Sequence, residues 1–321
     1  MKTLLRSVAC VALLLACIGC AQKRILLVSQ YGPGHPCTVA VEDTLRQALQ
    51  KENMAPPIRT FDINTLGHPT EMWRDEMGRM AVVRAQAWNP SVIVAVGDEA
   101  ARYFVQRLAG TSRRFVFVGL KGDPADYKFG NALNVTGVRE DVPVHEAFAL
   151  MKDLVPSARR VAVLADAGLD GDAVVRRIQA AGTLPLEVSV VKRAQTIEQW
   201  LAAVQEVQTQ ADLLCLASYE AVIADPAVND ALPGDEVLRR TAQANRLPDF
   251  SFRADAVGPE GVMAAVTCPI EKQAEIAASM AIGVMYYFKD IGRMRVETCT
   301  AREEAVSPER AAQLGITLVP E

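Results

Sequence analysis

Polar, aromatic and charged side chains follow the short apolar runs of this sequence, where a ligand could reach them. In sheets of parallel strands, ligands bind beyond the carboxyl ends of the strands, so the residues after each run are candidate contacts. The candidates combine aromatic rings, carboxylates and one guanidinium. We predict ligand contacts at Gln30, Tyr31, Gly97, Asp98, Glu99, Gly119, Leu120, Asp166, Ser218, Tyr219, Phe252 and Arg253.

This mixture of groups favours a zwitterionic ligand such as an amino acid. Asp98 or Glu99 could bind an amine and Arg253 a carboxylate, because charge-assisted hydrogen bonds are the strong ones. Other roles stay open for the same residues. Asp98 could cap the helix that follows it, and Arg253 could be a solvated rim residue or form a salt bridge between domains. Tyr31 and Tyr219 could serve packing alone.

The sequence offers no positive sign of catalysis, a cofactor or a metal. A glycine-rich turn at residues 32–34 lacks the third glycine of a dinucleotide fingerprint, because Cys37 stands in its place. The three histidines are scattered without ligand spacing, and neither an HExxH motif nor a GxSxG elbow occurs. We therefore expect a binding protein without a cofactor or a metal site, and not an enzyme.

The elements that must position these side chains alternate between short apolar runs and longer amphipathic segments. Such alternation is typical of helices packed around parallel sheets. The pattern restarts after residue 138, which predicts a second domain of the same plan. The predicted strands are residues 24–29, 58–63, 92–96, 115–118, 160–165, 186–191, 212–217 and 249–252.

We therefore predict an α/β fold of two doubly wound parallel-sheet lobes joined by a hinge. The hinge is expected near Val138 and residues 252–261, and closure about it would bury a ligand between the lobes. The predicted boundaries are residues 20–138 with about 262–295 for lobe one, and residues 139–261 with the C-terminal tail, about 296–321, for lobe two.

The first residues have the features of an export signal. Lys2 and Arg6 form a positive start, and the apolar residues 8–18 are too few for a membrane-spanning helix. We predict a signal peptide at residues 1–19 and lipid modification of Cys20, with soluble secretion as the alternative. A lipid-modified terminus would anchor the protein to the cell membrane or the outer membrane, facing the periplasm or the exterior.

Charge and cysteine content narrow the classes further. The 321 residues carry a formal net charge of −4 without a run of basic residues, so the electrostatic footprint of a nucleic-acid binder is absent. Beyond Cys20 lie Cys37, Cys215, Cys268 and Cys299, none of them in a CxxC pair. Cys215 is predicted to be a buried strand residue, and pairing of Cys268 with Cys299 stays open.

Four stretches of the chain resemble one protein family. Residues 94–101 resemble its strand and Gly-Thr-x-Ala-Ala turn, and residues 115–138 its region between lobes. Residues 154–164 are similar to its entry into the second lobe, and residues 311–320 to its Ala-x-x-Leu-Gly-Ile-x-x-Pro ending. The family is that of ABC-transporter substrate-binding lipoproteins of the tryptophan/tyrosine-type group, which have the type I periplasmic-binding-protein fold.

The resemblance implies that the protein captures a small-molecule ligand and delivers it to an ABC permease. The alternative is a ligand-sensing lipoprotein that signals to a membrane receptor or kinase. Asp98 stands where the family usually has threonine, and residues 218–220 stand where many members have an Asp-Asn pair, so the ligand of the family is not carried over. We expect an exported, lipid-anchored monomer.

Overall fold

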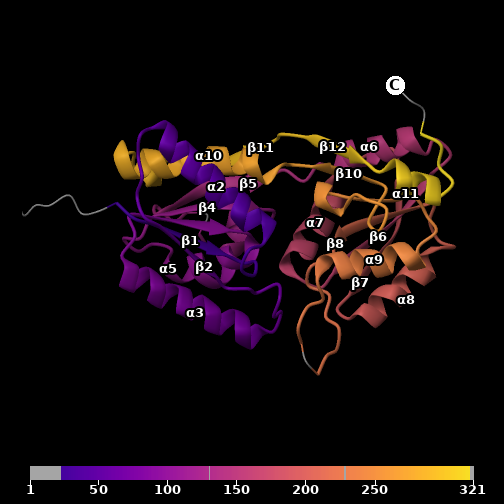
Figure 1. The fold of residues 1–321 in the computed structure, drawn as a ribbon, viewed down its shortest axis with the longest axis horizontal. Helices are drawn as coiled ribbons and strands as arrows, with labels where there is room; N and C mark the ends of the chain where they lie inside the picture. Colours follow the sequence, from indigo (N-terminus) through magenta and orange to yellow (C-terminus); the bar gives the residue numbers. More distant parts are fainter. Residues whose placement is uncertain (1–22, 130, 228, 319–321) are drawn as a thin grey trace, which may run out of the picture.

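Two six-stranded sheets organise the chain, each flanked by helices (Figure 1). The computed structural model describes residues 23–318 except residues 130 and 228. The predicted signal peptide and its lipidation site, Cys20, lie outside the described residues. The predicted fold class, α/β with two mostly parallel sheets, is confirmed.

The first sheet and the helices around it form lobe one. All its strands are parallel, in the order β11-β5-β4-β3-β1-β2. A π-helical turn, Ala101–Val105, joins two of its short helices, and 3₁₀ turns lie at Pro124–Tyr127 and Ile291–Arg293. Its strands and α-helices are β1 (Ile25–Ser29), α2 (Pro36–Lys51), β2 (Ile58–Asp62), α3 (Glu71–Trp88), β3 (Val92–Val96), α4 (Asp98–Ala100), α5 (Gln106–Leu108), β4 (Phe115–Leu120), β5 (Val135–Glu140), α10 (Ile270–Tyr286) and β11 (Glu297–Cys299).

The second sheet and its helices form lobe two. Its strand order is β12-β10-β9-β8-β6-β7, and β12 alone among these strands pairs antiparallel. A 3₁₀ turn lies at Ala254–Ala256. Its other elements are α6 (Val144–Leu154), β6 (Arg160–Asp166), α7 (Leu169–Ala180), β7 (Glu187–Ala194), α8 (Ile197–Val207), β8 (Leu213–Ser218), α9 (Gly234–Ala244), β9 (Asp249–Ser251), β10 (Ala264–Thr267), β12 (Glu303–Val306) and α11 (Pro308–Gln313).

The central strands of each sheet are buried on both faces. In lobe one, Leu27 and Val94 pack in the layer with α2 and α10, while Leu26 and Ile93 pack in the layer with α3. Successive side chains of a strand point to opposite faces, so covering both faces requires apolar residues along the whole strand. In lobe two, α6 and α7 cover one face of the sheet, and α8 and α9 cover the other. This double cover explains the continuous apolar runs that predicted the strands.

Three connections, called the crossings below, join the lobes. Residues 141–143 lead from β5 to α6, residues 268–269 from β10 to α10, and residues 300–302 from β11 to β12, which is the connection seen along the top of Figure 1. These crossings do not coincide with the hinge that the sequence predicted. Val138 lies inside β5, and residues 252–261 follow β9 within lobe two, so neither belongs to a crossing.

Two lobe boundaries in the structure differ from the predicted ones for a related reason. β10 pairs with β9, so lobe two extends to Thr267, and the return to lobe one does not begin near residue 262. β11 pairs with β5, so lobe one extends to Cys299 rather than to residue 295. Strands of three or four residues carry too little periodicity for a sequence pattern to assign them to one sheet.

Two cysteines meet at the crossings. Cys268 lies in the second crossing, and Cys299 is the last residue of β11, directly before the third. Both are buried, and the Cys268 thiol donates a hydrogen bond to the Cys299 carbonyl oxygen at 3.3 Å. Cys215 is buried in β8, as predicted. All four cysteines of the described residues are free thiols, which answers the open question of pairing.

The close contact between β4 and β5 depends on Gly137. Its φ is 155°, and a Cβ atom placed on it would lie 2.3 Å from the carbonyl oxygen of Phe117. We expect Gly137→Ala to lower the free energy of unfolding by about 1 to 3 kcal/mol, because backbone atoms must move apart. Urea unfolding measures the loss. Gly258→Ala is the control, because nothing lies within 4 Å of its Cβ position, and equal losses in both variants would contradict the argument.

Candidate functional site

A cavity of about 290 Å³ lies between the two lobes. Loops that follow parallel strands form much of its wall, because the carboxyl ends of both sheets face it. The remaining wall comes from the crossings and the start of α10. Of the predicted contacts, those that line the cavity are Tyr31, Gly97, Gly119, Ser218, Tyr219, Phe252 and Arg253.

Aromatic rings from both lobes line this cavity. Tyr31 follows β1 and is buried, with its ring stacked on His35 at a centroid distance of 3.9 Å. Tyr219 and Phe252 follow β8 and β9 and are also buried. The Arg253 guanidinium lies 5.9 Å from the centroid of the Tyr219 ring. Such rings can hold the apolar body of a small ligand, while a few polar groups fix its orientation.

One ionic cluster joins the lobes beside these rings. Glu220 of lobe two contacts Arg253 of its own lobe at 2.9 Å and His35 of lobe one at 3.2 Å. His35 caps the first turn of α2, since its Nδ1 accepts the backbone N–H of Cys37. The other ring nitrogen, Nε2, is therefore the one that faces Glu220. Arg253 is also bound by Asp255, which leaves its guanidinium well supplied with acceptors.

The ionisation of Glu220 makes the stability of the folded protein depend on pH. Burial raises the pKa of Glu220, but the charge of Arg253 and the hydrogen bond with His35 outweigh burial and lower it from 4.5 to about 2. The folded pKa is below the unfolded one, so the stabilisation is present above about pH 4.5 and is lost as the pH falls toward 2. Between these pH values, we expect wild-type protein to lose more unfolding free energy than Glu220→Gln. Urea unfolding across this range tests it, and equal losses would contradict it.

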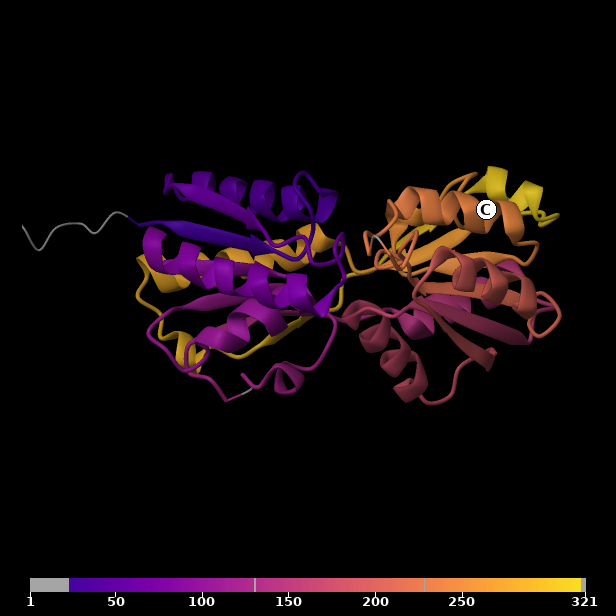
Figure 2. The same cartoon turned by 90° about the horizontal axis from the view of Figure 1, so that it is seen from below.

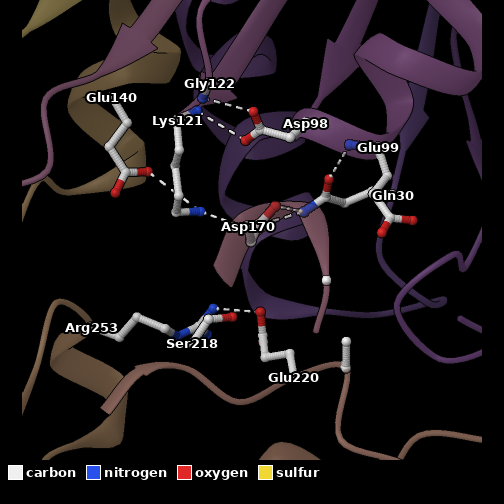
Figure 3. Close-up of polar contacts among 12 residues, drawn as sticks. Gln30, Asp98, Glu99, Lys121, Gly122, Glu140, Asp170, Ser218, Glu220 and Arg253 are labelled. Carbon is white, nitrogen blue, oxygen red and sulfur yellow. Dashed lines mark hydrogen bonds and ion pairs between the residues drawn. The ribbon is translucent and has the colours of Figure 1, made fainter. Parts of the chain in front are cut away.

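A second ionic cluster crosses the cleft nearer the crossings (Figure 3). Lys121, after β4, binds Asp170 of α7 at 2.7 Å, and Gln30 reaches the same carboxylate at 3.4 Å. Glu140, at the end of β5, lies 3.8 Å from the Lys121 ammonium. Burial lowers the pKa of Lys121, but the neighbouring carboxylates, first Asp170, raise it well above its usual value. Lys121 is therefore a fixed cation between two acids.

The lobes also touch at their rim away from the crossings. The backbone N–H of Ala231 donates to the carbonyl oxygen of Gly67 at 2.8 Å. Beside it, His68 and Asp230 approach within 2.6 Å. Together with the two ionic clusters, these contacts hold the lobes in a closed arrangement, and Figure 2 shows the lobes side by side from below.

Asp98 and Glu99, predicted to hold an amine, do not line the cavity. The Asp98 carboxylate accepts the backbone N–H groups of Lys121 and Gly122 at 2.9 and 2.8 Å (Figure 3). It also accepts the Tyr127 hydroxyl. It caps no helix, since Gly97 is the N-cap residue of α4 and no side chain caps that helix. Glu99 is fully buried in a two-pronged ion pair with Arg74. Both carboxylates organise lobe one.

Three other predicted contacts lie behind the cavity wall. The Gln30 side chain accepts the backbone N–H of Glu99 at 2.8 Å. Leu120 is part of the lobe-one core. Asp166 accepts the Ser218 hydroxyl at 2.7 Å and the backbone N–H of Ala221 at 3.1 Å, so it shapes the loop after β8. The position of these three residues at strand ends correctly indicated loops that reach the cavity. The sequence does not show which way the side chain of a loop residue points.

Several cavity residues are not among the predicted contacts. Lys121 and Glu220 belong to the candidate loops after β4 and β8, directly after the predicted contacts Leu120 and Tyr219. Asp170 lies in the first turn of α7, and no feature of the sequence marked it as a ligand contact. Glu140 and Gln273 come from the end of β5 and from α10, whose proximity depends on the crossings. No pattern in the sequence brings those two elements together.

Two absences apply to the part of the chain that the structure describes. Within residues 23–318, apart from 130 and 228, no group of three or more histidine, cysteine, aspartate or glutamate side chains is arranged to hold a metal ion. In the same residues, every helix is too short or too polar to cross a membrane.

Comparison with known proteins identifies the architecture. The sequence matches no family model and no curated protein. Among solved structures, an ABC domain in complex with L-Trp from Streptococcus pneumoniae has a TM-score of 0.71 at 16% identity, covering 92% of this chain and 96% of that one. A conserved domain protein from Vibrio cholerae has a TM-score of 0.73 at 19% identity, covering 94% and 96%.

A third similar structure is the ligand-free, open form of a substrate-binding protein with adhesive properties from Clostridium difficile. Its TM-score is 0.64 at 16% identity, covering 92% of this chain and 96% of that one. At such identities the likeness concerns the fold and leaves the ligand open. The two six-stranded, mostly parallel sheets, the three crossings and the cavity between them give this chain the fold of the type I periplasmic binding proteins.

Proposed function

We propose that the protein is an extracytoplasmic solute-binding protein that captures a small organic ligand between its lobes for an ABC importer. The observation that carries this proposal is the cavity itself, which strand-end loops of both lobes line and which polar contacts between the lobes enclose. The similar solved structures support the same role. A cavity lined mainly by aromatic and apolar groups with a few charged ones is typical of small-molecule sites.

Capture proceeds by hinge closure about the three crossings. In the open form, the loops of each lobe are exposed, and a ligand binds to one lobe first. Closure then forms the pairs of His35 with Glu220 and of Lys121 with Asp170, which connect opposite walls of the cavity. A ligand that binds the closed form more tightly shifts the population toward it. The closed form is the one that a permease would recognise.

The favoured ligand is a small amine with an apolar or aromatic body, such as an amino acid. The rings of Tyr31, Tyr219 and Phe252 support the apolar body. The carboxylates around the cavity support an amine, and the guanidinium of Arg253 supports a carboxylate. The proposal includes membership of the tryptophan/tyrosine-type group of binding proteins, whose name refers to amino acids of this description.

The proposal includes export and anchoring. Cleavage after residue 19 and lipid modification of Cys20 would leave the lobes outside the cytoplasm, close to the membrane that carries the permease. Incorporation of radiolabelled palmitate into wild-type protein, and none into Cys20→Ala, is the expected result. Labelling of both proteins or of neither would contradict the anchor without touching the binding role.

A thermal-shift screen of residues 21–321 tests the binding function. The panel holds amino acids, aromatic amines, nucleosides, short peptides and sugars. At a concentration 100-fold above its Kd, a ligand that binds only the folded state adds about 2.7 kcal/mol to the unfolding free energy, which raises the melting temperature. Silence across the whole panel would contradict the proposed function.

Each hit is then repeated with two arginine variants. Arg253→Ala removes a cation that lines the cavity, whereas Arg293→Ala removes one whose side chain is 88% exposed, on lobe one. We expect binding to weaken in Arg253→Ala alone. Equal effects in both variants would place the ligand outside the cavity.

A further inference from the structure

Glu140 is a cavity carboxylate with few partners. It ends β5 directly before the first crossing, and it is 8% exposed. Its closest cation is Lys121, whose ammonium lies 3.8 Å from Oε2 but only 2.7 Å from Asp170. Within the described residues, the one hydrogen bond of its carboxylate is a long contact of 3.5 Å from the Gln273 amide. A buried carboxylate usually has closer donors, so Glu140 has accepting capacity to spare.

Gln273 supplies a second acceptor on the same wall. This residue lies in the first turn of α10 after the second crossing, is fully buried and lines the cavity. Its Nε2 donates to the Cys268 carbonyl oxygen at 3.1 Å and to Glu140, while its Oε1 has no partner among the described residues. Exchanging the two amide atoms would set an oxygen against two acceptors, so the orientation is fixed.

Most of the charged side chains that line the cavity are acidic. Lys121 and Arg253 are the basic side chains that line the cavity within the described part of the chain, and both are engaged by acids. The acidic side chains on the same wall are Glu140, Asp170, Glu220, Asp255, Glu271 and Glu303. This excess of carboxylates attracts a cationic group.

We propose that Glu140 and Gln273 form a subsite for the protonated amine of the ligand, at the end of the cavity next to the crossings. A primary ammonium carries three N–H donors and no acceptor. It can therefore donate hydrogen bonds to the Glu140 carboxylate and to the unpartnered Gln273 amide oxygen at the same time. A hydroxyl group has one donor and cannot do both. This assignment rests on the proposed function only in treating the cavity as the ligand site.

Both residues of the subsite belong to lobe one. Glu140 precedes the first crossing and Gln273 follows the second, so their relation does not change when the lobes separate. The amine therefore binds to lobe one in the open form, and lobe two then closes over the rest of the ligand. This order also explains why the acceptors need no partner from lobe two.

Methylammonium is the probe that tests the subsite, because it has the donors of an amine without the rest of a ligand. Methylammonium and tetramethylammonium are each titrated into residues 21–321 in a calorimeter. Tetramethylammonium has the same charge but no N–H donor. We expect saturable binding of methylammonium alone. Glu140→Gln and Gln273→Met should each raise its Kd about tenfold or more, as expected for losing a hydrogen bond to a charged group.

Glu304→Gln is the matched control, since it removes one negative charge from an exposed residue next to the cavity wall but not part of it. It should leave the Kd for methylammonium within about twofold of wild type. Equal binding of both cations, or equal weakening by Glu140→Gln and Glu304→Gln, would overturn the subsite. If one subsite variant does not fold, the other variant and the comparison of the two cations still decide.

The subsite and the proposed function can fail separately. A solute that binds in the thermal-shift screen without preference for amines, together with no methylammonium binding, would remove the subsite and keep the binding role. Methylammonium binding that depends on Glu140 and Gln273, together with a silent screen, would keep the subsite and remove the role in solute capture.

Discussion

Replacing Arg310 with methionine is expected to lower the free energy of unfolding by about 3 to 5 kcal/mol. Arg310 lies on α11 and is 3% exposed, and its guanidinium binds the fully buried Asp249 of β9 at 2.7 Å. The same guanidinium donates to the carbonyl oxygen of Ala242 at the end of α9. Methionine fills the space but leaves Asp249 charged, buried and without its cation, which is the costly outcome.

Urea unfolding followed by circular dichroism measures this effect. Arg293→Met is the control, because its side chain is exposed and a surface pair contributes little. Asp249 also accepts the backbone N–H of Met263 and the Asn245 amide, so Asp249→Leu should be at least as damaging as Arg310→Met. A loss in Arg310→Met no larger than in Arg293→Met would contradict the role of the buried pair.

Asp98→Ala is expected to lower the free energy of unfolding by roughly 2 to 4 kcal/mol, with little direct effect on ligand binding. The change leaves three buried donors without an acceptor, namely the backbone N–H groups of Lys121 and Gly122 and the hydroxyl of Tyr127. Thermal and urea unfolding measure the loss. Asp98→Asn is the matched variant, because it keeps one acceptor oxygen of the same shape and should lose less.

The result also separates two interpretations of Asp98. From the sequence, its place after a strand suggested an amine-binding carboxylate, whereas its contacts show a support for the loop after β4. If Asp98→Ala kept its stability but lost affinity for an amine, the interpretation from the sequence would be right. If stability fell and the affinity of the folded fraction stayed, the structural role would be confirmed.

The sequence predicted much of the fold because both sheets are covered on both faces. Strands such as Val92–Val96 and Phe115–Leu120 are apolar throughout, which distinguishes them clearly from the amphipathic helices between them. Ligand loops followed from the same pattern, since the carboxyl ends of parallel strands gather at one edge. Tyr31, Tyr219 and Arg253 were found in this way and line the cavity.

The remaining features depend on contacts that no local pattern contains. Whether Glu99 faces the cavity or Arg74 depends on how α3 packs, and Arg74 lies 25 residues away in the sequence, beyond the reach of a local pattern. Gln273 reaches the cavity because the chain returns to lobe one after completing most of lobe two. The second and third crossings follow strands of four and three residues, which are too short to show a period. The sequence therefore predicted positions along the chain better than side-chain directions.

The placement of α10 has a consequence for the order in which the protein can fold. This helix packs against α2 and covers one face of the lobe-one sheet, yet it follows nearly all of lobe two in the chain (Figure 1). During synthesis, α2 alone covers that face until residue 286 has left the ribosome. Lobe two, whose strands β6 to β10 are contiguous, can collapse earlier. Lobe one therefore stays incomplete while most of lobe two is synthesised, and nascent chains that stop before α10 should expose apolar surface to chaperones.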